Sequence, residues 1–341
     1  MPPFFNLLLN IMSVYVKMYI ILLVVNVYLN GGHILVYSNV LEALGNTPLI
    51  KLSKIVPEDS AEILVKYEGL NVGGSIKTRT AYSMVCEAEK KGIINKDTII
   101  VEPTSGNQGI GLSLIGAVKG YKVRIIMPDS VSEERRKLVH AYGAELVLVH
   151  DDGDIGKCIE ECLQTALRMA KEDPRVWVPQ QFENPDNPMV HRITTAKEIL
   201  RDADRPIHGF CSGVGTGGTL TGIGETLKEA NPDIVIWAVE PENAAILSGG
   251  SIGTHLQMGI GDGLIPANLN LEIFEDIAIV TDAEALETSR RLIGEEGILC
   301  GISSGTNVAA ALRLAKKLGK GKTVVTVLPD TGERYFSTEL F

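Results

Sequence analysis

The feature that most constrains the fold is a repeated order of apolar strand, glycine-containing turn and helix, which runs from Asn39 to the C-terminus. Short apolar runs rich in β-branched residues predict strands at Glu62–Tyr67, Thr98–Val101, Lys122–Met127, Glu145–Val149, Ile207–Cys211, Ile234–Val239 and Thr323–Leu328. Helical periodicity separates most of these runs, for example at Gly109–Lys119, Ile155–Lys171, Thr219–Glu229 and Thr306–Leu318. Such alternation is typical of the α/β fold class, in which helices cover both faces of parallel sheets. These sheets bind ligands at the carboxyl ends of their strands, so the loops that leave the predicted strands are the candidate sites.

The length and charge of the chain exclude several classes of function. Its 341 residues suggest two domains of ordinary size, and the proline-rich segment Asn184–Met189 is the candidate junction. Acidic residues outnumber basic ones by 42 to 32 and no basic block occurs, so nucleic acid is not an expected partner. The six histidines and five cysteines lack metal-ligand spacing. We therefore expect no metal site and reduced, buried thiols, as in a cytoplasmic protein.

Residues 1–35 do not match the rest of the chain. The segment Ile11–Leu29 is long and apolar enough to approach a membrane span, although two polar residues interrupt it. It is either a membrane anchor or an over-extended start of translation. We favour the start-site artefact, because the codons of the glycine pair at 31–32 begin with GG, as a bacterial ribosome-binding site does. A start at position 35 or 36 would then follow at a suitable distance, and a membrane is not an expected partner.

One lysine stands where its charge is least stable. Two glycines and Ser75 precede a helix-like run, and Ser75 is a natural N-cap, which places Lys77 in the first helical turn. The positive pole of the helix dipole destabilises an ammonium group there, so we expect the pKa of Lys77 to be lowered. A Schiff-base enzyme needs such a neutral amine to attack an aldehyde.

The loop Ser212–Gly222, SGVGTGGTLTG, follows a predicted strand and precedes a predicted helix. Its glycines let the backbone approach a ligand closely, and the N–H groups at the helix start favour a phosphate, with Thr216 and Thr219 as further donors. The same loop matches the dinucleotide pattern G-x-G-x-x-G, and Glu240 follows at a suitable distance. By itself the loop leaves a dinucleotide, an isolated phosphate and a plain tight turn open.

Two further loops carry polar side chains between a strand and a helix. EPTSGNQG, at Glu102–Gly109, brings hydroxyl and amide groups to a helix N-terminus, which suits a small carboxylate, although a helix cap needs only one of them. CGISSGTN, at Cys300–Asn307, offers Ser303 or Ser304 as a helix cap. Together the loops supply a phosphate cradle, a carboxylate receptor, a lone hydroxyl and a lysine of lowered pKa. Pyridoxal phosphate carries both an aldehyde and a phosphate, so it is the cofactor that suits this combination.

These motifs together resemble the cysteine synthase (O-acetylserine sulfhydrylase) and cystathionine β-synthase family of pyridoxal-phosphate enzymes. The resemblance runs from LGNTPLIKL at Leu44 to the C-terminus. It implies fold type II, the tryptophan synthase β-subunit-like fold, with two three-layer α/β domains. The smaller domain would be residues 74–183, and the larger one residues 36–73 and 184–341. The resemblance also implies a homodimer, and it suggests the tail of a serine acetyltransferase as a further partner.

The family's pattern implies a role for each motif residue. Lys77 would hold the cofactor covalently and later move the α-proton of the substrate, Asn107 would bind the ring 3′-oxygen, and Ser303 would face the pyridine nitrogen. The residues implied for the phosphate are Gly215, Thr216, Gly217, Gly218 and Thr219. Those implied for the α-carboxylate of the substrate are Thr104, Ser105, Gln108 and Gln181.

The chain departs from the family's common pattern at Val72, Thr78, Gln108 and Asp262. The last of these lies in GIGDGLIP, where cysteine synthases usually carry alanine. Asp262 either caps a solvent-facing loop or reaches the cleft, where a carboxylate would repel bisulfide and could deprotonate a neutral nucleophile.

We therefore expect a pyridoxal-phosphate-dependent β-replacement enzyme. The first choice is a cysteine synthase that makes L-cysteine and acetate from O-acetyl-L-serine and sulfide. The second is a cysteine-consuming enzyme that releases hydrogen sulfide and forms serine or a thioether. An NAD-dependent dehydrogenase is a remote alternative.

Overall fold

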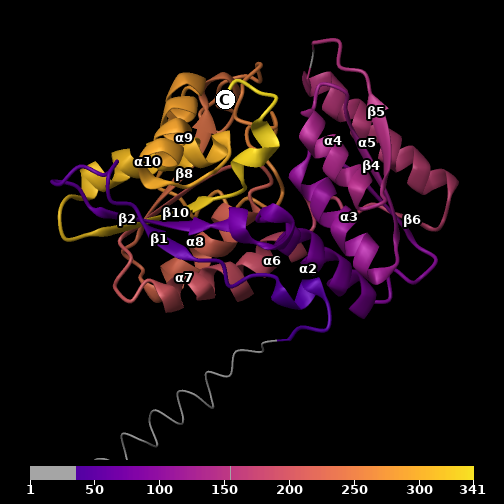
Figure 1. Ribbon diagram of the computed structural model, residues 1–341, viewed down its shortest axis with the longest axis horizontal. Coiled ribbons are helices and arrows are strands. Elements are labelled where there is room, and N and C mark those ends of the chain that lie inside the picture. The colour runs from indigo at the N-terminus through magenta and orange to yellow at the C-terminus, as the bar shows by residue number, and fades with distance from the viewer. Residues whose placement is uncertain (1–35, 154) are drawn as a thin grey trace, which may run out of the picture. The chain divides into compact units, whose positions relative to one another are not determined.

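The computed structural model describes residues 36–153 and 155–341 (Figure 1). The chain divides into two units, residues 1–42 and 43–341, and every strand of the described chain belongs to the second unit. A short 3-10 helix, η1, spans Val40–Ala43. The apolar segment Ile11–Leu29 lies outside the described residues. Among the residues that are described, no helix is long and apolar enough to cross a membrane.

Two sheets organise the unit of residues 43–341. The first has six strands in the order β1-β2-β10-β7-β8-β9, and only the β1–β2 pair is antiparallel. Its strands are β1 (Leu49–Lys51), β2 (Glu62–Tyr67), β7 (Gly209–Gly213), β8 (Val235–Pro241), β9 (Asp276–Val280) and β10 (Thr323–Leu328). The second has four parallel strands in the order β5-β4-β3-β6. They are β3 (Ile99–Pro103), β4 (Lys122–Pro128), β5 (Glu145–Val149) and β6 (Val176–Trp177).

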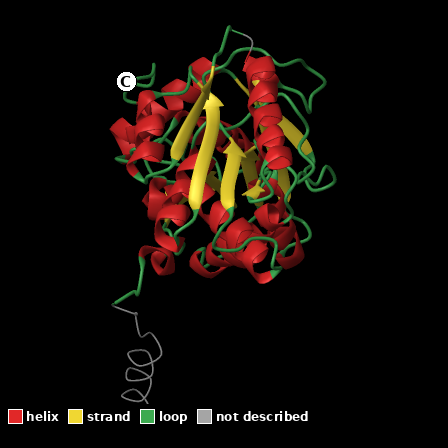
Figure 2. Cartoon of the chain, turned by 90° about the vertical axis from the view of Figure 1, so that its right-hand side faces the viewer, coloured by secondary structure: helices red, strands yellow, loops and turns green. Residues whose placement is uncertain are grey.

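Helices cover both sheets, as Figures 1 and 2 show. Those that pack on the four-stranded sheet are α3 (Asn107–Lys119), α4 (Glu133–Ala141) and α5 (Ile155–Glu172). The six-stranded sheet carries α8 (Gly218–Ala230), with α7 (Ala196–Asp202) beside it, and α10 (Ile302–Leu318), with α9 (Asp282–Glu296) beside it. Helix α2 (Lys77–Lys90) packs against α3 and α6 (Asp186–Val190), and a π-helical turn, η4 (His191–Thr195), continues α6. Short 3-10 turns are η2 (Glu68–Leu70), η3 (Val72–Gly74), η5 (Glu242–Ala244) and η6 (Gly332–Tyr335).

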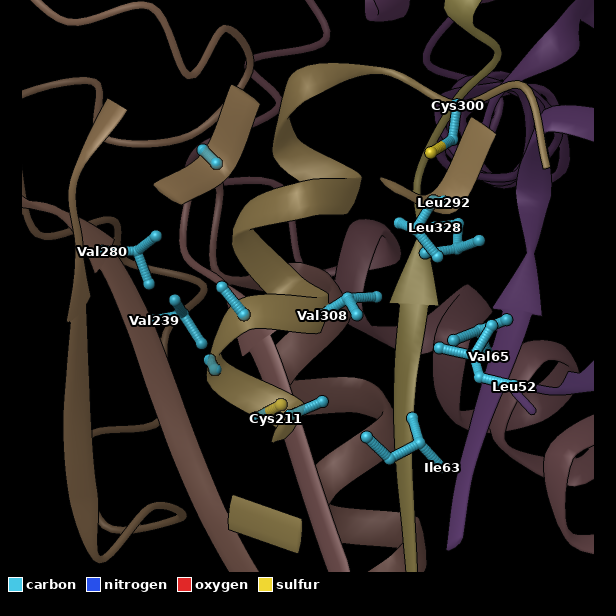
Figure 3. Packing of buried hydrophobic residues seen from close by; sticks show 14 of the residues in the cluster. Leu52, Ile63, Val65, Cys211, Val239, Val280, Leu292, Cys300, Val308 and Leu328 are labelled. Carbon is cyan, nitrogen blue, oxygen red and sulfur yellow. The ribbon is translucent and has the colours of Figure 1, made fainter. Parts of the chain in front are cut away.

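Alternating residues of the six-stranded sheet point into two apolar layers. On β10, Val324 and Leu328 join the layer that contains α9 and α10, whereas Val325 and Val327 join the layer that contains α7 and α8. Figure 3 shows the first layer, in which Val308 of α10 lies among strand residues. Burying one such side chain stabilises the fold by about 1.5–3 kcal/mol. Both faces of the sheet are therefore packed, which holds the strand ends, and the loops that leave them, in a rigid frame.

The structure confirms the α/β class and most of the predicted strands. The sequence gave no prediction for β1, β6 and β9, because strands of two or three residues show no periodicity and β9 has exposed and buried residues in irregular order. The strands of the four-stranded sheet lie within residues 74–183 and those of the other sheet lie outside them. The exact domain boundaries stay a prediction.

Two helices begin earlier than predicted. Helix α3 begins at Asn107 and α10 begins at Ile302. Ser303 and Ser304 therefore lie inside the first turn of α10, and the prediction that one of them caps the helix is wrong. The N-cap is Gly301, whose extended backbone needs no side-chain partner to begin the helix. The five cysteines are free thiols, four of them buried and Cys86 partly buried, as the sequence predicted.

Candidate active site

One cavity gathers nearly all the residues that the sequence singled out. Pro103, Gly213 and Pro329 contribute to its wall, so it lies where β3, β7 and β10 end. The predicted residues that line it are Lys77, Thr104, Ser105, Asn107, Gln108, Gln181, Gly215, Thr216, Gly217, Thr219, Asp262 and Ser303. Gly218 is not part of the lining and is instead the first residue of α8. The strand-end rule for parallel sheets thus located the site from the sequence.

Lys77 is the first residue of α2 and reaches the cavity. Gly73 and Gly74 before it have φ angles of 76° and 69°, a left-handed backbone that turns the chain sharply into the helix. Burial is the main cause that lowers the pKa of Lys77, whereas the charges of Asp262 and Asp330 act against it. The direction agrees with the prediction, but the structure shows burial as the largest cause rather than the position at the helix start.

Ser75 does not cap α2, so that prediction is wrong. Its backbone is extended, with φ −161° and ψ 163°, and it forms an isolated β-bridge with Asp330. Its hydroxyl is buried and has no hydrogen-bond partner within the described chain. Ile76 stands at the N-cap and offers no side-chain bond. The bridge, which is distant in sequence and invisible to local patterns, determines the conformation of Ser75.

The glycine loop between β7 and α8 needs its glycines because other chains approach it closely. Gly217 has a φ angle of 75°, and a Cβ added there would lie 2.7 Å from the Cβ of Leu269. A Cβ on Gly215 would lie 2.5 Å from the carbonyl oxygen of Gly259. A Cβ on Gly218 would overlap the side chain of Asn187. The loop therefore lies against the cavity as bare backbone.

The N-terminus of α8 has no side-chain cap. Its first N–H groups are thus free of side-chain partners, and the positive end of the helix dipole adds to them. Thr216 and Thr219 carry hydroxyls on the same wall of the cavity, and Thr216 accepts a hydrogen bond of 2.9 Å from Asn187 Nδ2. This is the arrangement that binds a phosphate dianion.

The loop before α3 presents a second group of donors. Thr104, Ser105 and Gln108 line the cavity, and α3 also begins without a side-chain cap. The amide of Gln108 is buried, and within the described chain neither its oxygen nor its nitrogen has a partner. An unpaired buried amide destabilises a fold by about 1–3 kcal/mol, so this side chain is suited to a polar ligand.

Asn107 is held from both sides of its amide. Its Nδ2 donates a hydrogen bond of 2.7 Å to Asp330 Oδ2, and Arg334 donates to its Oδ1. The hydroxyl of Tyr335 donates to the same Asp330 oxygen at 2.7 Å. The side-chain orientation of Asn107 is therefore fixed, and one N–H of its amide stays free for a ligand on the cavity side.

Asp262 lines the cavity, so the alternative of a solvent-facing cap is wrong. Burial raises the pKa of its carboxyl, whereas the charges of Lys77 and His255 act against that shift. Asp262 lies in a loop with left-handed glycines at 261 and 263, which aim it inward where a helix or strand could not. The cavity thus contains an acidic group opposite the amine of Lys77.

The dinucleotide alternative loses its acidic residue in the structure. The carboxylate of Glu240 accepts hydrogen bonds from the N–H groups of Leu247 and Ser248 and from the hydroxyl of Ser248. Glu240 is buried and is not part of the cavity wall. It holds a turn after β8, so it does not complete a dinucleotide site at the glycine loop.

The residues fit pyridoxal phosphate at both ends of the molecule. The uncapped start of α8 and the glycine loop suit the phosphate, and Lys77 suits the aldehyde. The free N–H of Asn107 and the hydroxyl of Ser303, which is buried in the first turn of α10, offer polar contacts for the ring. The amide of Gln108 remains for a polar group beside the cofactor.

Sequence reasoning missed the residues that hold this site from behind. Asp330 and Arg334 fix Asn107, Asn187 supports Thr216, and Asn307 joins the ends of β7 and β10. The amide of Asn307 accepts from Gly213 N–H at 2.7 Å and donates to the Val327 carbonyl at 2.8 Å. A signal existed for Asp330, which directly follows the end of β10, as a ligand-site residue should. No local pattern marks Asn187 or Asn307.

A family model described as pyridoxal-phosphate dependent enzyme matches residues 40–330. The chain belongs to this family. A cysteine synthase of Staphylococcus aureus is 49% identical over 308 residues, which cover 89% of this chain and 97% of the relative. The solved structure of a hydrogen sulfide-producing enzyme from Fusobacterium nucleatum is 44% identical, with a TM-score of 0.84 and coverage of 88% of this chain and 100% of that one. The structure of O-ureido-L-serine synthase is 41% identical, with a TM-score of 0.83 and coverage of 90% and 95%.

Membership in the pyridoxal-phosphate dependent family confirms several expectations at once. The fold is type II, the cofactor is pyridoxal phosphate, and the protein is an enzyme of the β-replacement class. The relatives differ in their named reactions, so the exact pair of substrates is a separate question. The assignment of individual residues to cofactor and substrate is taken up below as a proposal.

Proposed function

We propose that this enzyme makes L-cysteine and acetate from O-acetyl-L-serine and sulfide. The observation that carries the proposal is the amine of Lys77, whose pKa burial lowers, in a cavity that also contains an uncapped helix N-terminus. The identity with a cysteine synthase over most of both chains supports this choice of substrates. When bound, pyridoxal phosphate supplies an electron sink that makes the α-hydrogen of an amino acid acidic and lets its β-substituent leave.

The residues of this chain would divide the work between binding and proton transfer. We assign to Lys77 the covalent hold on the cofactor and, at its Nζ, the removal of the α-proton of the substrate. The glycine loop from 215 to 219 would bind the phosphate, Asn107 the ring 3′-oxygen, and Ser303 the pyridine nitrogen. The α-carboxylate of the substrate would accept hydrogen bonds from Thr104, Ser105, Gln108 and Gln181.

The neutral hydroxyl of Ser303 matters for the reaction type. A serine beside the pyridine nitrogen leaves that nitrogen unprotonated, which moderates the electron sink and suits elimination at the β-carbon. We also expect a homodimer, a cytoplasmic location, two domains that close on the substrate, and a cleft able to receive the tail of a serine acetyltransferase.

A second candidate function is favoured by Asp262. A carboxylate on the cavity wall would repel bisulfide and could deprotonate water, a thiol or an amine, which suits an enzyme that consumes cysteine and releases hydrogen sulfide. Burial raises the pKa of Asp262, which brings it nearer the range of an effective general base. The likeness to a hydrogen sulfide-producing enzyme agrees with this candidate.

Steady-state kinetics on the purified enzyme decide between the two. We expect kcat/KM for cysteine formation from O-acetyl-L-serine and sulfide to exceed kcat/KM for hydrogen sulfide release from cysteine. The reverse order would favour the cysteine-consuming reaction. Absence of both activities from enzyme that retains its cofactor would contradict the proposed function as a whole.

A further inference from the structure

Glu102 is a fully buried carboxylate near the end of β3, one residue before Pro103. Its two oxygens accept separate backbone hydrogen bonds of 3.0 Å, Oε2 from the N–H of Gln180 and Oε1 from the N–H of Gln181. Within the described chain these two N–H groups are the only groups that act to keep the carboxyl ionised. A buried carboxylate without a cation is unfavourable, so its presence here requires a reason.

The turn that Glu102 holds is strained. Gln180 has a φ angle of 55°, a left-handed backbone that residues other than glycine seldom adopt and that destabilises the fold by about 1–2 kcal/mol. The carbonyl of Gln181 accepts two further bonds, from Asn187 Nδ2 at 2.7 Å and from Asn268 Nδ2 at 2.9 Å. The peptide groups on both sides of the Gln181 Cα are therefore fixed by buried side chains.

The side chain of Gln181 is the part of this turn that faces the cavity. Gln181 lines the same wall as the donors of the loop before α3. Asn187, which holds its carbonyl, also donates to Thr216 of the glycine loop at 2.9 Å. One chain of hydrogen bonds thus runs from Glu102 through Gln181 and Asn187 to the loop proposed for the phosphate.

We propose that Glu102 is a positioning residue, whose ionised carboxylate holds the Gln180–Gln181 turn so that the Gln181 amide reaches the α-carboxylate of the substrate. This inference rests on the proposed function, because it takes an amino acid as the ligand of Gln181. It goes beyond that function in assigning a task to a group that never touches the substrate.

Protonation of Glu102 breaks this arrangement. Each oxygen now faces an N–H donor, so a proton on either oxygen places a second donor against that N–H and removes one of the two bonds. Burial raises the pKa of Glu102 to about 7, and no charged side chain of the described chain acts on it. The enzyme should therefore bind its amino-acid substrate more weakly as the pH falls through neutrality.

The test is the variant Glu102→Gln, which keeps the shape of the side chain and copies the protonated state. Loss of one hydrogen bond to a charged acceptor should raise KM for the amino-acid substrate about tenfold and leave kcat within about twofold. The pH dependence of KM near neutrality should disappear, and the cofactor should be retained as in the wild type. Glu296→Gln is the matched control, because Glu296 also accepts backbone N–H bonds, from Ser53, Lys54 and Ile55, away from the cavity.

A double-mutant cycle with Gln181→Ala separates positioning from general loosening of the fold. Without the Gln181 side chain nothing remains to be positioned, so Glu102→Gln should add little to KM in that background. An additive effect, an unchanged KM in Glu102→Gln, or an equal effect of Glu296→Gln would overturn the inference while leaving the proposed function intact. If Glu102→Gln does not fold, the pH profiles of the wild type and Gln181→Ala decide, since only the wild type should lose affinity below neutrality. Absence of turnover in the wild type would instead contradict the proposed function.

Discussion

Asn107 and Asp330, 223 residues apart in sequence, share a hydrogen bond of 2.7 Å at the wall of the cavity. Asn107 begins α3 and Asp330 follows β10, so the bond joins a helix on the four-stranded sheet to a strand end of the six-stranded one. Asp330 is fully buried, and its second oxygen has no partner within the described chain. The carboxylate therefore stabilises the site chiefly through Asn107 and Tyr335.

Replacing Asp330 by Asn should weaken cofactor retention. The variant loses a charge-assisted acceptor for Asn107, whose amide then has no fixed orientation toward the ring, and the dissociation constant should rise about tenfold. Titration of the apoenzyme with pyridoxal phosphate, followed by absorbance, measures the effect. Tyr335→Phe removes the other donor to the same oxygen without touching Asn107, so it should weaken binding less. Equal losses in both variants would show that Asp330 acts through general stability.

The hydroxyl of Thr219 offers a clean test of the phosphate loop. Thr219→Val keeps the shape of the side chain and removes a donor, so it should raise the dissociation constant of pyridoxal phosphate about tenfold without lowering the Tm of the apoenzyme. Thr226→Val, two turns further along α8, is the matched control, since Thr226 bonds only the helix carbonyl of Gly222. If both variants bind the cofactor as well as the wild type, the phosphate lies elsewhere. Gly217→Asp would be a poorer test, because a side chain there also meets Leu269 and a left-handed backbone.

The sequence predicted the frame of the site better than its support. Lys77, the glycine loop and the donors before α3 stand where parallel strands end, and that rule uses only strand order. The N-cap role of Ser75 was wrong because a β-bridge to Asp330 decides its backbone. Such tertiary contacts outweigh local propensity and leave no periodic trace.

Residues that act through other residues were the least predictable. Glu102 was noted only as the first letter of a loop, although its carboxylate holds the turn of Gln181. Asn187 and Asn307 each bond groups from two segments, and nothing in their neighbours indicates it. The environment of Asp262 could be stated from the sequence only as two alternatives, and the structure decided between them.

Asp262→Ala should change the choice of nucleophile. A carboxylate in the cavity disfavours bisulfide and can activate a neutral nucleophile, so the variant should lose activity with cysteine by a factor on the order of 10²–10⁴. Its synthesis of cysteine from O-acetyl-L-serine and sulfide should be retained or improved. Both assays must be run at one pH, because the fraction of sulfide present as bisulfide changes near neutrality. A parallel fall of the two activities would instead indicate that Asp262 supports the structure of its loop.

Glu198 should stabilise the fold in a pH-dependent way. Burial alone would raise the pKa of Glu198, but the hydrogen bond and charge of Arg79, with help from Lys66, hold it at about 2 instead of the ordinary 4.5. A depressed pKa contributes stability above about pH 4.5 that is lost as the pH falls toward 2, and the difference corresponds to about 3 kcal/mol. Arg79 lies two residues after Lys77 in α2, so this ion pair also fixes the helix that carries the reactive amine.

Denaturant unfolding of Glu198→Gln at several pH values measures this contribution. The variant should be less stable than the wild type by about 3 kcal/mol at pH 7, and the gap should narrow below about pH 4.5. Glu133→Gln, which breaks an exposed pair with Lys137, should change stability by less than about 1 kcal/mol. A gap for Glu198→Gln that does not vary with pH would show that lost packing, rather than lost charge, is responsible.

The central claim is that Lys77 binds pyridoxal phosphate covalently in this cavity. The direct measurement is borohydride reduction of the purified enzyme, followed by proteolysis and mass spectrometry of the peptides. The account predicts that the mass of the reduced cofactor is found on Lys77 in the wild type. In Lys77→Ala the label and turnover should both be absent while the protein remains folded. A label on any other lysine, or wild-type turnover in Lys77→Ala, would contradict the account.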